Sequence, residues 1–410
     1  YPVHVFLFCV FILVSLGVAR GGFNPKLRPY NLCNAAWYTQ TPQQAHLILS
    51  NPFCLLRTIE LESLQNPNYF DEKELSTIYS PYHYPKSTFA YELGKRNIII
   101  FILESFSKEH SKFYCPELYP DSDGYTPFLD SLMRKSYTFT NAFSNGMKSI
   151  EALPSILTSI PSYQKPFVMM PQSLGKLEGL PYILSQEGYS TSFFCGTERN
   201  SMFFEAYASM AGVETFFSKE DYEKDYPVNV NTIEPFWGVF DMPFYQFMAD
   251  KIETMKQPFC VSIFNLTSHH PYTLPPDYAD KMPKGHSLVQ PCVAYTDVSL
   301  RKLFERIQKE PWYNNSIFIF IADHGSPEMY APQTRLPKGR SAIFYFIYTP
   351  DNVIQGTDTH VTQQLDVMPT LLGLIGYNKP YFAFGRDVFN EKERFPMATN
   401  YINEVYQCIT

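Results

Sequence analysis

Five runs of hydrophobic residues recur along the chain and are separated by segments of helical periodicity. The runs, each five to eight residues long, lie at 97–103, 191–195, 259–266, 316–322 and 342–348. Continuous β-branched and aromatic stretches of this length are typical of strands that are buried on both faces of a sheet. The amphipathic segments lie at 127–135, 180–187, 244–255 and 293–308. This alternation predicts an α/β domain with a central, largely parallel sheet flanked by helices.

A further apolar stretch lies at the start of the chain. Residues 2–19 contain no Lys, Arg, Asp or Glu, and their number is just sufficient for a transmembrane helix, which needs roughly 17 to 25 residues. The alternatives are a buried core helix and the apolar part of a signal peptide. We favour the transmembrane helix, because the apolar part of a signal peptide is usually only about 7 to 15 residues long.

These patterns divide the 410 residues into four parts. We expect a transmembrane helix at 1–19, a connector at 20–94 with a short helix near 41–49, a large α/β domain at 95–390 and a C-terminal segment at 391–410. The chain begins with Tyr rather than Met and stops in an apolar pattern, so we expect residues to be missing at both ends. A net charge of -7 argues against a nucleic-acid binder, which needs Lys and Arg to neutralise phosphates.

Chemically versatile side chains follow two of the predicted strands directly. Glu104 follows the run at 97–103, and Asp323 and His324 follow the run at 316–322. Ligand sites of open α/β sheets lie beyond the carboxyl ends of the strands. One Glu, one Asp and one His form a ligand set suited to Mg, Mn or Zn. Taken singly, a carboxylate after a strand can also simply cap the next helix.

Two other segments carry candidate residues. In the sequence NGMKSIEALP at 145–154, a glycine-containing loop leads into Ser149 at the start of a helical pattern. A helix N-terminus favours anions, and a metal-bound hydroxyl can act as a nucleophile, although an ordinary capping serine is the alternative. His269 and His270 follow the run at 259–266 and could bind a metal, hold an anionic group or protonate a leaving oxygen.

The segment at 359–376 contains His360 and Asp366 at the start of an amphipathic helical pattern. A surface histidine and a helix-capping aspartate explain these residues as well as a role on the substrate side of the site does. Both interpretations stay open at the level of sequence.

In this order, the segments resemble the sulfatase-like domain of the lipoteichoic acid synthase family in the alkaline phosphatase superfamily. The resemblance extends over residues 20–410. It rests on IFILESF at 100–106, NGMKSIEALPSIL at 145–157, GYSTSFFCGTERNSM at 188–202, WGVFD at 237–241, SHHPY at 268–272, ADHG at 322–325 and QLDVMPTLLGLIG at 364–376.

The resemblance implies an enzyme with membrane helices and an extracytoplasmic catalytic domain. It implies one divalent cation, Mn before Mg or Zn, and the expected ligands are Glu104, Ser149, Asp323 and His324. It makes Ser149 the nucleophile, with a phospho-enzyme that an alcohol or water resolves. It also implies a set of residues that contact the substrate, namely Cys195, Asn200, His269 and His270.

The sequence departs from the family pattern at three positions. Cys195 stands where many relatives have His, and Met202 and Phe204 stand where a Trp and an Arg of lipoteichoic acid synthases bind glycerophosphate. The resemblance therefore leaves the exact substrate open.

We predict a membrane-anchored, extracytoplasmic, metal-dependent phosphotransferase or phosphodiesterase that acts on a phospholipid head group or an envelope glycan. One alternative is a sulfuric ester hydrolase, but Ser149 is not followed by the Pro and Arg of the Cys/Ser-x-Pro-x-Arg motif. The other is a catalytically inactive, membrane-anchored binding or sensing module. The presence of all four expected metal-site residues argues against it.

Overall fold

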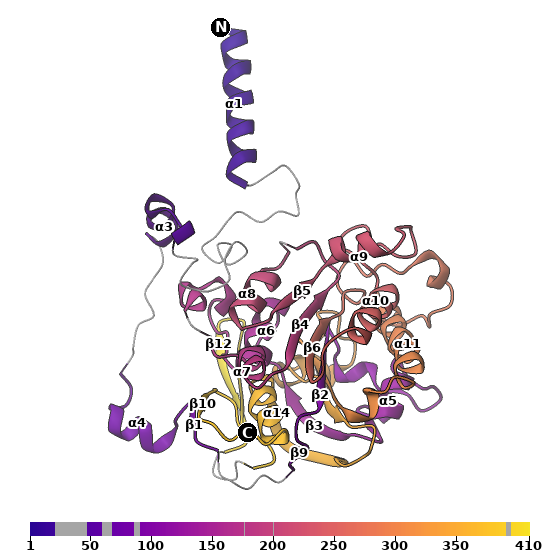
Figure 1. The fold of residues 1–410 in the computed structure, drawn as a ribbon. Helices are drawn as coiled ribbons and strands as arrows, with labels where there is room; N and C mark the ends of the chain where they lie inside the picture. The colour runs from indigo at the N-terminus through magenta and orange to yellow at the C-terminus, as the bar shows by residue number, and fades with distance from the viewer. Residues whose placement is uncertain (21–46, 60–67, 86–90, 176, 200, 391–394) are drawn as a thin grey trace.

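The computed structural model describes residues 1–20, 47–59, 68–85, 91–175, 177–199, 201–390 and 395–410. A central sheet of eight strands dominates the large domain (Figure 1). Its strands, in spatial order, are β5 (Thr215–Phe217), β4 (Ser190–Cys195), β6 (Phe259–Phe264), β2 (Asn97–Leu103), β7 (Ser316–Ala322), β8 (Tyr345–Tyr348), β3 (Tyr137–Phe143) and β9 (Gly356–Gln363).

The sheet is largely parallel, as predicted. Only β8 runs antiparallel to its two neighbours, β7 and β3, while the other pairs are parallel. The carboxyl ends of all strands except β8 therefore meet at one edge of the sheet. We call this the catalytic edge, because the loops that follow these strands carry the candidate residues.

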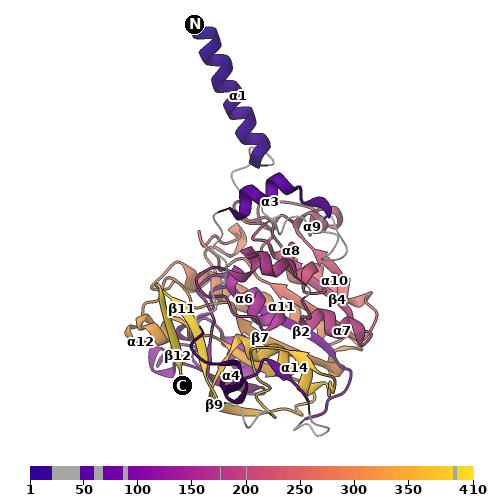
Figure 2. The same ribbon diagram turned by 90° about the vertical axis from the view of Figure 1, so that its left-hand side faces the viewer.

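Helices cover both faces of the sheet (Figures 1 and 2). One group consists of α5 (Pro127–Met133), α10 (Asp241–Glu253) and α11 (Val289–Ile307), of which α11 contacts the other two. The other consists of α6 (Ser149–Thr158), α7 (Leu180–Gln186), α8 (Phe204–Met210) and α14 (Val367–Leu374). Three short helices lie in loops, namely α9 (Lys219–Asp225), α12 (Pro332–Arg335) and α13 (Pro337–Arg340).

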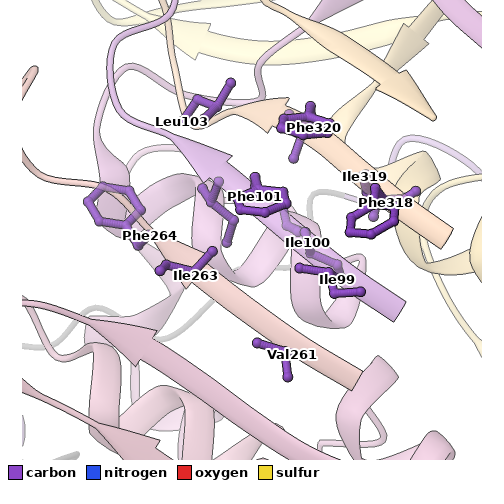
Figure 3. Packing of buried hydrophobic residues seen from close by; sticks show 14 of the residues in the cluster. Ile99, Ile100, Phe101, Leu103, Val261, Ile263, Phe264, Phe318, Ile319 and Phe320 are labelled. Carbon is purple, nitrogen blue, oxygen red and sulfur yellow. The ribbon is translucent and has the colours of Figure 1, made fainter. Parts of the chain in front are cut away.

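The core explains the apolar runs of the sequence. All seven residues of β2 and all seven of β7 are buried, because helices cover both faces of the sheet. Phe101 of β2 stacks on Phe320 of β7 with ring centroids 4.6 Å apart, and its edge meets Tyr245 of α10. Figure 3 shows the β-branched residues of β2 packed beside those of β6. Such two-sided burial is the reason that these strands show no alternation of polar residues.

The N-terminal region contains α1 (Pro2–Arg20), α3 (Asn51–Thr58) and α4 (Glu72–Ile78). Within the part of the chain that the structure describes, no helix has both the length and the apolar character required to cross a membrane. The short helix expected near 41–49 falls mostly outside the described residues.

Segments outside the predicted α/β domain also pack on it. The two-residue strand β1 (Tyr82–His83) of the connector pairs with β10 (Tyr381–Phe382). The C-terminal segment forms a hairpin of β11 (Ala398–Ile402) and β12 (Val405–Ile409). The amide of Asn145, in the loop before α6, donates to the Thr399 carbonyl of this hairpin at 2.7 Å. The hairpin therefore supports the loop that carries Ser149.

Candidate active site

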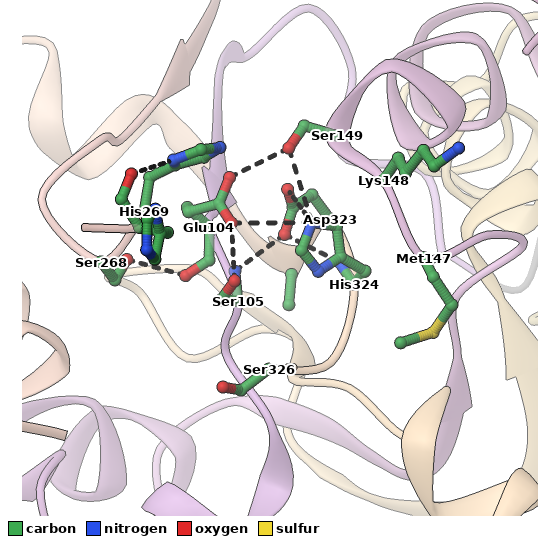
Figure 4. Close-up of polar contacts among 12 residues, drawn as sticks. Glu104, Ser105, Met147, Lys148, Ser149, Ser268, His269, Asp323, His324 and Ser326 are labelled. Carbon is green, nitrogen blue, oxygen red and sulfur yellow. Dashed lines mark hydrogen bonds and ion pairs between the residues drawn. The ribbon is translucent and has the colours of Figure 1, made fainter. Parts of the chain in front are cut away.

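The pairing of β2 with β7 brings the two predicted carboxylates together. Leu103 is in register with Ala322, so the next residues, Glu104 and Asp323, leave the sheet side by side. Ser149, the first residue of α6, faces them across the catalytic edge (Figure 4). Its hydroxyl donates to Glu104 Oε2 at 2.9 Å and lies 3.5 Å from His324 Nε2. The four residues that the sequence predicted as one site form one cluster.

The cluster has the chemistry of a divalent-metal site. Glu104, Asp323 and His324 each offer one ligand atom within 4.8 Å of the others, and all three residues are buried. His324 Nδ1 contacts the Gly325 carbonyl at 2.9 Å, which leaves Nε2 directed at the carboxylates, 3.2 Å from Asp323 Oδ2. Apart from this contact with His324, Asp323 Oδ2 is buried without a hydrogen-bond partner. Because a buried polar atom is costly without a partner, this oxygen and the oriented imidazole fit a bound cation.

The electrostatics of the cluster favour a cation as well. Burial and the charge of Glu104 raise the pKa of Asp323 to about 8. Burial also opposes ionisation of Glu104, but the charges of His324 and His269 outweigh it and lower the pKa of this carboxyl. The pKa of His324 is raised in spite of its burial, because Asp323 and Glu104 stabilise the imidazolium. The two acids thus compete for one proton and one imidazole, and a divalent cation would balance both charges.

Ser105 links the two carboxylates. Its hydroxyl donates to Glu104 Oε1 at 2.6 Å, and its backbone N–H donates to Asp323 Oδ1 at 2.9 Å. Ser105 is buried and has a φ of 61°. A left-handed conformation of a residue other than glycine costs on the order of 1–3 kcal/mol and persists only where the surroundings impose it. The strained residue therefore fixes the mutual orientation of the two acids.

The Ser105→Ala variant should bind Mn²⁺ roughly ten- to a hundredfold more weakly, which is the usual effect of removing a partner that orients a ligand. The substitution keeps the backbone N–H and removes only the bond to Glu104. Calorimetric titration of the metal-free protein measures the change. Ser136→Ala is the matched control, because Ser136 is also buried but donates to Leu132 at the opposite edge of the sheet. Equal metal affinity of the two variants would contradict the role of Ser105.

A buried polar network supports Glu104 from the side of β6. Asn265 follows this strand and accepts a hydrogen bond from the Glu104 backbone N–H at 2.7 Å. Its amide donates to Asp241, the first residue of α10, at 3.1 Å. Asp241 also accepts from the Leu266 backbone and from Thr296 of α11. The sequence does not reveal Asn265, because the apolar run at 259–266 places it inside a strand, whereas β6 ends at Phe264.

Gln364 connects the loop that carries Asp323 and His324 to the loop that precedes Ser149. Its side-chain amide donates to the carbonyls of Ala322 and Asp323 at 2.8 and 2.7 Å. Its side-chain oxygen accepts from the Asn145 backbone at 2.9 Å. Gln364 lies two residues before Asp366, the candidate residue that the sequence indicates in this segment. The side chain is fully buried, and no local pattern reveals that function.

The carboxylate of Glu151 caps the N-terminus of α6. It accepts from the backbone N–H groups of Met147 and Lys148 at 2.9 and 3.1 Å. This arrangement requires a glycine at position 146, because a Cβ there would lie 2.4 Å from Glu151 Oε2 and 2.7 Å from Glu151 Cβ. Capping of this kind fixes the first turn of the helix and with it Ser149.

We expect Gly146→Ala to displace the Glu151 side chain and to lower both activity and stability. Loss of a helix cap costs about 0.5–2 kcal/mol, and the shift of Ser149 should reduce turnover by roughly a hundredfold. Urea unfolding and steady-state kinetics measure the two effects. Gly188→Ala is a control for the residue change, since a Cβ at Gly188 meets no atom within 4 Å although its φ of 88° adds strain. A Gly146→Ala variant with unchanged turnover would contradict this account.

The predicted substrate-contacting residues have different environments. His269 lies beside Glu104 (Figure 4), and its Nδ1 contacts the His270 carbonyl at 2.8 Å. The Trp237 and His269 rings meet edge to face at a centroid distance of 4.3 Å. His270 is exposed, with its ring against Tyr272. Asn200 lies outside the described residues.

Cys195 is completely buried at the end of β4, with Sγ 3.5 Å from the Thr197 hydroxyl. Burial raises the pKa of this thiol to about 11, so it stays protonated at neutral pH. Phe204 is also fully buried and packs on Phe193 and Phe264. Met202 is half-buried. The positions at which the sequence departs from the family pattern thus carry apolar or neutral groups.

The structure distinguishes the two interpretations of residues 359–376. Asp366 accepts from the backbone N–H groups of Gln363 and Arg386, at 3.0 and 2.9 Å. His360 is exposed and lies 2.8 Å from an Asp358 oxygen. These contacts match the structural interpretation, that of a capping aspartate and a surface histidine.

The fold and the site define an α/β protein of the alkaline phosphatase type. A protein of the alkaline phosphatase superfamily from Vibrio parahaemolyticus matches with a TM-score of 0.68 at 22% identity, covering 80% of this chain and 78% of that one. The lipoteichoic acid synthase LtaP from Listeria monocytogenes matches with a TM-score of 0.65 at 19% identity, covering 78% and 81%. The periplasmic domain of EptC from Escherichia coli has a TM-score of 0.53 at 16% identity, covering 78% and 93%.

The chain belongs to the sulfatase family, whose sequence model matches residues 96–377. Among its relatives are lipoteichoic acid synthases. Lipoteichoic acid synthase 1 of Bacillus subtilis is 25% identical over 350 residues, which are 79% of this chain and 53% of that protein. Lipoteichoic acid synthase 2 of Bacillus subtilis is 24% identical over 76% of this chain and 50% of that protein. The chain thus spans about half the length of the curated relatives it matches.

Proposed function

We propose that the chain is a metal-dependent phosphotransferase or phosphodiesterase with Ser149 as its nucleophile. The observation that carries this proposal is the position of the Ser149 hydroxyl, 2.9 Å from Glu104 Oε2 and 3.5 Å from His324 Nε2, at the N-terminus of a helix. A nucleophile, a metal-ligand set and a helix N-terminus that attracts anions converge on one point.

In the proposed reaction, the phosphoryl group is transferred first to Ser149 and then to an alcohol or water. Ser149 donates its proton toward Glu104 and its oxygen attacks phosphorus, while the bond from phosphorus to the leaving oxygen breaks. His269, beside Glu104, gives a proton to the leaving oxygen. In the second half, an alcohol or water loses its proton to His269 and attacks the phosphoserine, and the Ser149 oxygen leaves and regains its proton. A divalent cation held by Glu104, Ser149, Asp323 and His324, with Mn²⁺ preferred, would favour the ionised hydroxyl and offset the phosphoryl charge.

Phosphate rather than sulfate esters are the proposed substrates. Formylglycine-dependent sulfatases need Pro two residues after the nucleophile, whereas this chain has Glu151, which caps α6. The names of the relatives, lipoteichoic acid synthases and EptC, support a phospholipid head group or an envelope glycan as the substrate. The buried Phe204 and the half-buried Met202 argue that the donor is bound differently from glycerophosphate in lipoteichoic acid synthases.

For location, we propose a cell membrane anchor at 1–19, a connector at 20–94, an extracytoplasmic catalytic domain at 95–390 and a C-terminal segment at 391–410. The support is the run of residues 2–19 without Lys, Arg, Asp or Glu, together with the relatives named above. Fractionation of cells that express the full chain, followed by protease treatment of intact cells or spheroplasts, tests the anchor and its orientation. A full chain recovered without membranes, or protected from protease, would refute this part.

The activity is tested with the full chain, Mn²⁺ and three chromogenic substrates, namely bis-p-nitrophenyl phosphate, p-nitrophenyl phosphate and p-nitrophenyl sulfate. We expect the diester to be turned over fastest, and mass spectrometry of the quenched reaction to locate a phosphoryl adduct on Ser149. Faster turnover of the sulfate would instead identify a sulfuric ester hydrolase. No turnover of any ester and no adduct, in protein that binds the metal, would favour an inactive binding or sensing module.

A further inference from the structure

Two loops at the catalytic edge carry five cations and no carboxylate. The first covers residues 281–288, between β6 and α11, and the second covers residues 332–340, which form α12 and α13 between β7 and β8. The loops occur in a chain with a net charge of -7. Their exposed cations, which we call the basic rim, are Lys281, Lys284, Arg335, Lys338 and Arg340.

The two loops are held together by consecutive residues of the segment that follows β7. The Leu288 backbone N–H donates to the Glu328 carboxylate at 3.0 Å, and Arg335 Nε donates to the Met329 carbonyl at 2.9 Å. His286 stacks on Tyr330 with ring centroids 4.6 Å apart. The basic rim is therefore one surface, although its parts are about fifty residues apart in the sequence.

This surface adjoins the candidate active site. A Cβ at Gly325, the residue after His324, would lie 2.2 Å from the Arg340 carbonyl, so the backbone of the second loop packs directly against the metal-site loop. Both loops follow strands whose carboxyl ends form the catalytic edge. In Figure 2, α12 lies at the outer edge of the domain, where a large partner can reach it.

The basic rim also carries two large apolar side chains in water. Leu288 is 67% exposed and Leu336 is 61% exposed. Four acidic groups adjoin the two loops. Asp280 precedes the first loop, Glu117 accepts from Gln333, and the half-buried Glu328 and the buried Glu109 accept from Leu288 and Thr334. A dissolved polyanion would bind only to the cations of this surface. A bilayer of anionic lipids would contact the cations and the leucines together, because the cations bind the head groups while the leucines insert at the boundary with the acyl chains.

We propose that the basic rim, with Leu288 and Leu336, is a docking surface for an anionic lipid bilayer, which it holds against the catalytic edge. Docked in this way, the loops after β6 and β7 would present the Ser149 site to lipid head groups. The choice of a bilayer as partner rests on the proposed function, whereas the charge and exposure of the surface do not.

Hydrogen exchange of the full chain, monitored by mass spectrometry, tests the proposal without any use of activity. The protein is mixed with nanodiscs of phosphatidylcholine alone, or of phosphatidylcholine and phosphatidylglycerol in equal parts. We expect peptides that cover 281–288 and 332–340 to exchange more slowly only with the anionic nanodiscs, and high salt to reverse the protection. Each Lys or Arg near an anionic surface strengthens binding roughly fivefold. The triple variant Lys284→Gln, Arg335→Gln and Lys338→Gln should therefore lose the protection.

Two further variants separate the contribution of the basic rim from that of total charge and from that of the two leucines. Lys135→Gln, Lys302→Gln and Lys309→Gln remove three exposed lysines that lie outside both loops, before β3, in α11 and before β7, and should leave the protection unchanged. Leu288→Ser with Leu336→Ser should weaken it at every salt concentration. Protection that is absent, or equal with both kinds of nanodisc, would overturn the proposal, as would protection by soluble polyphosphate alone. Turnover of the soluble diester is measured separately, so failure of the proposed function is distinguished from failure of docking.

Discussion

Replacing Ser149 with alanine should lower turnover of a phosphodiester by roughly a thousandfold or more, which is typical for loss of a nucleophile. The Ser149 oxygen lies within hydrogen-bond distance of Glu104, and no other hydroxyl of the four-residue cluster could replace it. The fold should persist, since alanine is well tolerated in the first turn of a helix. The measurement is steady-state turnover at saturating Mn²⁺, because Ser149 is also an expected metal ligand.

The matched variant is Ser149→Thr, which retains the hydroxyl at the same atom. It should keep turnover within about tenfold of the parent, because the added methyl group leaves the chemistry of the oxygen unchanged. Full metal-stimulated activity of Ser149→Ala would show that another group attacks, and the proposed mechanism would be wrong.

The Asp323→Asn variant should lose metal binding and activity and yet be more stable than the metal-free parent. In the parent, Asp323 Oδ2 is buried with only His324 Nε2 beside it, and burial together with the charge of Glu104 raises the pKa of Asp323 to about 8. An amide removes the repulsion and can donate to His324 Nε2, 3.2 Å from the present oxygen. We expect a gain of about 1–2 kcal/mol in the free energy of unfolding without metal, measured by urea unfolding beside elemental analysis.

Asp130→Asn is the control for a buried acid outside the site. Asp130 accepts from the Ser111 and Thr126 hydroxyls and from the Phe113 backbone. An amide at this position would place its N–H₂ group against one of these N–H or O–H donors. This variant should therefore lose stability and keep its metal affinity. If Asp323→Asn behaved like Asp130→Asn, the metal-site carboxylate would be a structural group rather than a ligand.

Much of the sheet was predictable because its central strands are buried on both faces. The runs at 97–103 and 316–322 match β2 and β7 residue for residue, and both form the middle of the sheet. β3 and β9 escaped prediction, because β3 lies near the edge of the sheet and β9 at the edge itself, and both mix polar with apolar residues, as in YTFTNAF and GTDTHVTQ. The run at 342–348 yields only β8 (Tyr345–Tyr348), since its first residues form isolated bridges.

The sequence predicted those residues of the candidate site that lie directly after a strand or at the start of a helix. Glu104, Asp323 and His324 follow the two clearest strands, and Ser149 opens a helix, so position alone suggested a common edge. The side chains that support the site could not be predicted from the sequence. Asn265 and Gln364 act through hydrogen bonds to backbone groups that are distant in sequence. Such partners depend on tertiary contacts, which periodicity does not encode.

The register between β2 and β7 has a consequence for how the protein matures. The proposed metal ligands Glu104 and Asp323 are brought together only by strands that lie more than two hundred residues apart in the chain. Strand pairing over such a separation is slow, because the loop-closure entropy is lost before the contacts form. High-affinity Mn²⁺ uptake should therefore lag behind the appearance of helical signal during refolding, which makes the ion a reporter of the last long-range step in assembly.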